Sequence, residues 1–123
     1  GQRSTIVDMP PSMGGQASGP TPGFHARAAV ASCVAIGIKL TATRAGIALE
    51  QVEVDIEMDF DDGASLGLGS NTAAPMQTRL NIALKSDAPA DELNAMVDRA
   101  LDADPFFLAL RDPQAVVTKI EKA

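Results

Sequence analysis

Residues 52–60 alternate strictly between apolar and acidic side chains, and this alternation constrains the fold more than any other feature. The apolar members are Val52, Val54, Ile56, Met58 and Phe60, and the acidic ones are Glu53, Asp55, Glu57 and Asp59. Successive side chains of a strand point to opposite faces, so a period of two predicts a strand with one core face and one solvated acidic face. A second alternating run over residues 76–85 predicts an antiparallel partner, which would bring Arg79 and Lys85 near the acids.

Two other stretches have the spacing of helices. From Phe24 to Ala45 an apolar stripe predicts one long helix, with Gly46 as its C-terminal stop. The stripe consists of Val30, Val34, Ile38, Leu40 and Thr41. Residues 89–103 place Leu93, Met96, Val97, Ala100 and Leu101 on one face behind Pro89, which predicts an amphipathic second helix.

The remaining segments complete an α+β fold with a mostly antiparallel sheet. Prolines and glycines make residues 9–23 a long loop, preceded by a short strand at residues 5–7. Asp104 and Pro105 predict a capped apolar turn over residues 106–110, and residues 116–120 favour a closing strand. We expect residues 1–123 to form a single domain.

Composition and charge exclude several classes of partner. The chain has 16 acidic and 10 basic residues and a net charge of −6, which repels phosphate backbones and anionic lipids. Four Phe with no Trp or Tyr offer little surface on which bases could stack. The longest apolar run, Ala28–Ile38, is shorter than the roughly 20 residues of a membrane-spanning helix. We therefore expect no nucleic-acid and no membrane partner.

Cysteine and histidine usage limits the chemistry further. With Cys33 and His25 as the single members of their kinds, neither an intrachain disulfide nor a Cys/His zinc site can form, and we expect no metal and no cofactor. A lone thiol, without a signal-peptide pattern in Gly1–Gly15, favours a cytoplasmic location.

Cys33 is the one candidate nucleophile, and its setting leaves two interpretations open. A thiol reacts as the thiolate, which needs a nearby cation, a helix N-terminus or hydrogen-bond donors, whereas a thiol on an apolar mid-helix face is usually inert. Arg27 lies on another face of the predicted helix, and His25 belongs to the start of that helix, so neither is an obvious partner.

Several local strings, in this order of elements, resemble the OsmC/Ohr family of thiol-dependent hydroperoxide reductases. They are Asp8-Met9-Pro10-Pro11-Ser12-Met13-Gly14-Gly15, Gly19-Pro20-Thr21-Pro22, the helix with Ala31-Ser32-Cys33, Leu80-Asn81-Ile82-Ala83-Leu84, and Asp104-Pro105. The resemblance covers nearly the whole chain. It implies an intertwined homodimer with the long cysteine-bearing helix at its centre and active sites at the subunit interface. We also expect the family's N-terminal strands to be incomplete in this chain.

The resemblance also implies a chemistry that uses two cysteines. A peroxidatic thiolate attacks a hydroperoxide and becomes a sulfenic acid, a second cysteine resolves it as a disulfide, and an external thiol restores the enzyme. Cys33 matches the peroxidatic position. Asp104 stands where the family has its second cysteine, and Phe24 stands where it has a glutamate that orients an arginine. The arginine itself would fall near Ile6, and Arg3 is out of register with it.

Three functional hypotheses follow. The chain is a divergent OsmC-like protein that retains only Cys33, or a one-cysteine peroxidase that reduces organic hydroperoxides with an external thiol. Alternatively, it is a non-catalytic dimeric ligand-binding or stress-associated protein. The family's geometry suggests that Phe24, Phe106 and Phe107 line its pocket.

Overall fold

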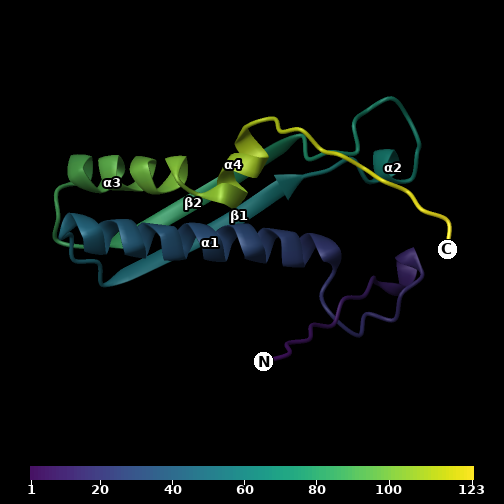
Figure 1. The fold of residues 1–123 in the computed structure, drawn as a ribbon, viewed down its shortest axis with the longest axis horizontal. Helices are drawn as coiled ribbons and strands as arrows, with labels where there is room; N and C mark the ends of the chain where they lie inside the picture. Colours follow the sequence, from purple (N-terminus) through teal and green to yellow (C-terminus); the bar gives the residue numbers. More distant parts are fainter.

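The computed structural model describes residues 1–123 and has two layers, helices lying against one face of a two-stranded sheet (Figure 1). Its elements are a 3₁₀ turn η1 (Pro11–Met13), α1 (Pro22–Ala45), β1 (Gln51–Asp59), α2 (Asp62–Ser65), β2 (Gln77–Lys85), α3 (Ala90–Asp102) and α4 (Pro105–Arg111). The α+β class, the long cysteine-bearing helix and the amphipathic second helix are therefore confirmed.

Helix α1 begins two residues earlier than the apolar stripe predicts. The Thr21 side chain accepts a hydrogen bond from the Phe24 N–H, and Pro22 occupies the first turn, where its missing N–H costs nothing. Gly46 ends the helix with a φ of 70°, a left-handed conformation that favours glycine.

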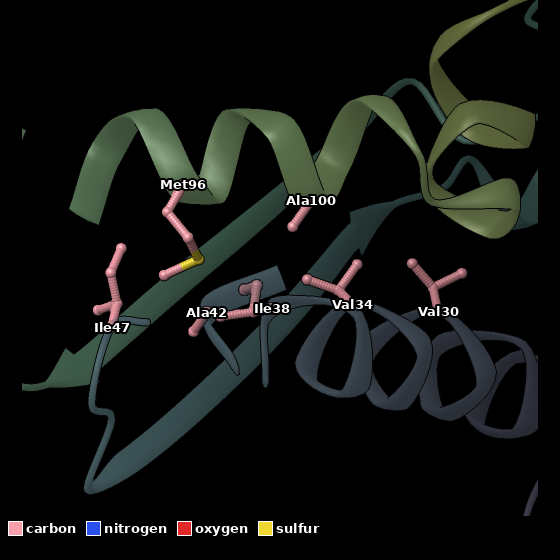
Figure 2. Close-up of a cluster of buried hydrophobic side chains, with 7 residues drawn as sticks. All are labelled: Val30, Val34, Ile38, Ala42, Ile47, Met96 and Ala100. Atoms are coloured by element: carbon pink, nitrogen blue, oxygen red, sulfur yellow. The ribbon is translucent and has the colours of Figure 1, made fainter. Parts of the chain in front are cut away.

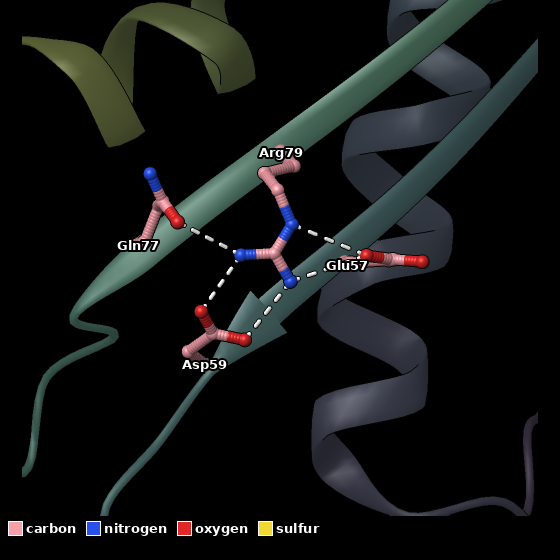
Figure 3. A network of polar contacts seen from close by, with 4 residues as sticks. All are labelled: Glu57, Asp59, Gln77 and Arg79. Atoms are coloured by element: carbon pink, nitrogen blue, oxygen red, sulfur yellow. Dashed lines mark hydrogen bonds and ion pairs between the residues drawn. The ribbon is translucent and has the colours of Figure 1, made fainter.

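The two strands pair in the predicted antiparallel sense. Glu57 lies opposite Arg79, and the guanidinium of Arg79 binds the carboxylates of Glu57 and Asp59 (Figure 3). The shortest of these contacts joins Arg79 Nη1 to Asp59 Oδ2 at 2.7 Å, and the hydrogen bond from Arg79 holds the pKa of Asp59 below its usual range. Lys85 instead pairs with Glu50, just before β1, at 2.8 Å.

The core is one cluster between α1, α3 and the inner face of the sheet (Figure 2). It contains Val30, Val34, Ile38, Ala42, Ile47, Met96 and Ala100. On α1 the buried positions recur every four residues, so the stripe ends on Ala42. Leu40, predicted to belong to this stripe, is 53% exposed because it points to another side of the helix.

The two predicted terminal strands are wrong. Residues 5–7 are not a strand: this segment folds back on itself around Asp8, whose carboxylate accepts from the N–H groups of Met9, Gln16 and Ser18 and from the Ser18 hydroxyl. These bonds hold the pKa of Asp8 well below its usual range. Residues 116–120 also form no strand, because no neighbouring strand lies beside them to supply hydrogen bonds.

The loop between the strands contains an element that the sequence analysis did not predict. Helix α2 is short, and its N-cap Asp61 accepts a hydrogen bond from the Ala64 N–H at 3.2 Å. The signal was present in the pair Asp61-Asp62, a capping residue followed by an acid in the first turn.

Helix α1 is long and apolar enough, by length and composition alone, to cross a membrane. The core helix of a globular fold has the same properties, and α1 buries Val34 and Ile38 almost completely in the core. The expectation that the protein contacts no membrane stays a prediction.

Candidate functional site

Cys33 lies half-buried in the middle of α1, at the edge of a shallow hollow of about 240 Å³. The wall on α1 consists of Ile36, Gly37, Leu40, Thr41 and Arg44, and the opposite wall, at the corner between α3 and α4, of Ala100, Ala103, Asp104 and Pro105. The hollow therefore joins two segments that are about 70 residues apart in the sequence.

Asp104 is the one charged residue buried in the fold, with 3% of its surface exposed. Its Oδ1 accepts hydrogen bonds from the N–H groups of Phe106 at 3.0 Å and Phe107 at 2.9 Å, so it caps α4 as the sequence predicts. Its Oδ2 faces α1 at Gly37, where an added methyl group would lie 3.6 Å away. The missing side chain at Gly37 leaves room for the carboxylate beside the helix.

The electrostatics of this site favour the neutral thiol. Burial raises the pKa of Cys33, and a hydrogen bond to the Asp104 carboxylate and the negative charge of Asp104 raise it further. The backbone N–H of Phe106 acts in the opposite direction, as the weakest of the four causes. This environment disfavours the thiolate, which is the form in which a peroxidatic cysteine reacts.

The candidate partners of Cys33 lie elsewhere. His25 accepts from or donates to no group near Cys33; its Nε2 lies 3.1 Å from the carbonyl oxygen of Ile6. The guanidinium of Arg27 lies over Gly23, toward the start of α1, and Arg3 is exposed in the N-terminal segment. The charge that acts on the thiol is that of Asp104.

None of the three phenylalanines predicted to line a pocket borders the hollow beside Cys33. Phe24 and Phe106 are each 53% exposed. Phe107 lines a different hollow, of about 490 Å³, between the start of β2 and α4, and its ring lies 5.5 Å below the guanidinium carbon of Arg111. A pocket completed by a second subunit stays a prediction.

Arg44 is the site residue that the sequence analysis missed. It follows Cys33 by eleven residues, which is about three helical turns, so the two side chains share one face of α1. This spacing was the available signal. Arg44 is exposed and forms no ion pair. No group of three or more His, Cys, Asp or Glu side chains lies close enough to hold a metal ion.

Solved structures with a similar arrangement of helices and strands define the class of fold of this chain. An OsmC-like protein from Mycoplasma pneumoniae aligns with a TM-score of 0.75 at 16% identity, over 89% of this chain and 74% of that chain. An organic hydroperoxide resistance protein OsmC from Legionella pneumophila aligns with a TM-score of 0.60 at 24% identity, over 90% and 76%.

A third structure shares this fold and contains a small molecule. It is a protein assigned to organic hydroperoxide resistance from Vibrio cholerae, with captopril bound in one of its active sites. Its TM-score is 0.57 at 20% identity, over 85% of this chain and 67% of that chain. All three describe an α+β fold of the OsmC type.

The family follows from the sequence itself. The model of the OsmC-like protein family matches residues 15–119, and the chain therefore belongs to that family. A comparison with curated proteins finds no significant match. The family resemblance inferred from the proline-glycine loop and the cysteine helix is confirmed.

Proposed function

We propose that this OsmC-like protein is a homodimer that binds a small ligand beside Cys33 and does not use Cys33 as a peroxidatic thiolate. The observation that carries the proposal is the buried carboxylate of Asp104 against the thiol, which raises the pKa of Cys33. Peroxide reduction by a cysteine begins with the thiolate, so a site that favours the thiol works against this reaction.

The identity of residue 104 supports the same proposal. The resemblance places the family's second cysteine at Asp104, and the fold brings this residue against Cys33, next to Gly37. A carboxylate cannot form a disulfide with a sulfenic acid. The resolving step would then require an external thiol at a site whose own charge is negative and which repels an incoming thiolate.

The exposed surface supports a homodimer. A folded monomer of 12.7 kDa exposes roughly 6,200 Å² by the usual relation of area to mass, whereas this chain exposes 9121 Å². Only eight of its 123 residues are buried. Part of the exposed apolar surface lies on α1 beside the site, where Ile36 is 60% and Leu40 53% exposed. A second copy packed on this face would bury part of the excess.

The alternative is a one-cysteine peroxidase, and one observation favours it. The N–H of Phe106 donates toward Cys33 and lowers the pKa of the thiol, as an activating donor would. The two candidates differ in how fast peroxide oxidises Cys33 in the protein without any ligand.

The test compares the rate of sulfenic acid formation in the purified protein with that of free cysteine at neutral pH. Cumene hydroperoxide and hydrogen peroxide are the oxidants, a dimedone adduct detected by mass spectrometry is the readout, and Cys33→Ser is the control. We expect Cys33 to react more slowly than free cysteine with both oxidants. Oxidation faster than that of free cysteine would support the peroxidase and overturn the proposal.

A further inference from the structure

We draw no further inference here: the strongest candidate, the mostly apolar groove between the start of β2 and α4 with the exposed C-terminal segment of a second copy as its occupant, restates the intertwined homodimer that the family resemblance implies.

Discussion

At the scale of single residues, the chemistry of this protein depends on the contact between Cys33 and Asp104. The sequence indicated that Asp104 replaces a second cysteine, and it also predicted Asp104 as the cap of α4. It could not show that one carboxylate does both, capping the helix through Oδ1 and facing α1 at Gly37 through Oδ2. The contact between Asp104 and α1 depends on how the turn between α3 and α4 packs on α1. No local sequence pattern encodes this packing.

Asp104→Cys tests whether position 104 corresponds to the family's second cysteine. We expect mild oxidation to give an intrachain disulfide between residues 33 and 104, detected as the loss of both free thiols by mass spectrometry. The cap of α4 is lost at the same time, which costs about 1 kcal/mol of stability in the reduced protein.

Asp104→Ser is the matched control, because serine caps the helix and cannot form a disulfide. If Asp104→Cys retained two free thiols after oxidation, or formed disulfides between chains alone, the correspondence would be wrong.

At the scale of elements, periodic patterns predicted what local geometry determines. The alternation of apolar and polar side chains predicted both strands and their antiparallel pairing. The four-residue spacing of Val30, Val34 and Ile38 predicted the buried face of α1. The assignment of Leu40 to that face was wrong because two residues of a helix turn through about 200°. Short elements such as α2 depend on a single cap and are harder to predict than long periodic ones.

Ile38→Val tests the packing of α1 in the core. Ile38 is fully buried against Met96, which is also fully buried. Removing one methylene from this contact should lower the free energy of unfolding by about 0.5–1.5 kcal/mol. Denaturant unfolding monitored by circular dichroism measures the change.

Ile120→Val is the control, since Ile120 is 93% exposed and should lose almost nothing. Equal losses in both variants would mean that Ile38 is not in the core, or that residues 116–120 are buried in solution.

At the scale of the whole molecule, the fold class could be predicted from the sequence and the two ends could not. Val116, Val117 and Ile120 have strong β propensity, yet they are 80–95% exposed and form no strand. A strand needs a neighbour that accepts and donates its backbone hydrogen bonds, and propensity does not supply one. The homodimer that the family resemblance implies stays a prediction.

Sedimentation equilibrium tests the homodimer directly. We expect twice the chain mass at micromolar concentration, and we expect Ile36→Glu to shift the protein toward the monomer because a buried unpaired charge opposes association. Leu68→Glu is the control, because Leu68 is as exposed as Ile36 and lies in the loop after α2. A monomeric wild-type protein, or dissociation by both variants alike, would contradict a dimer formed through α1.

Titration of Cys33, followed by thiolate absorbance in the wild type and in Asp104→Asn, tests whether the Asp104 carboxylate disfavours the thiolate. We expect the wild-type midpoint to lie above the ordinary thiol value of about 8.5. In Asp104→Asn it should fall, because the carboxylate that disfavours the thiolate is gone. A wild-type midpoint below the ordinary value would instead identify Cys33 as an activated thiolate.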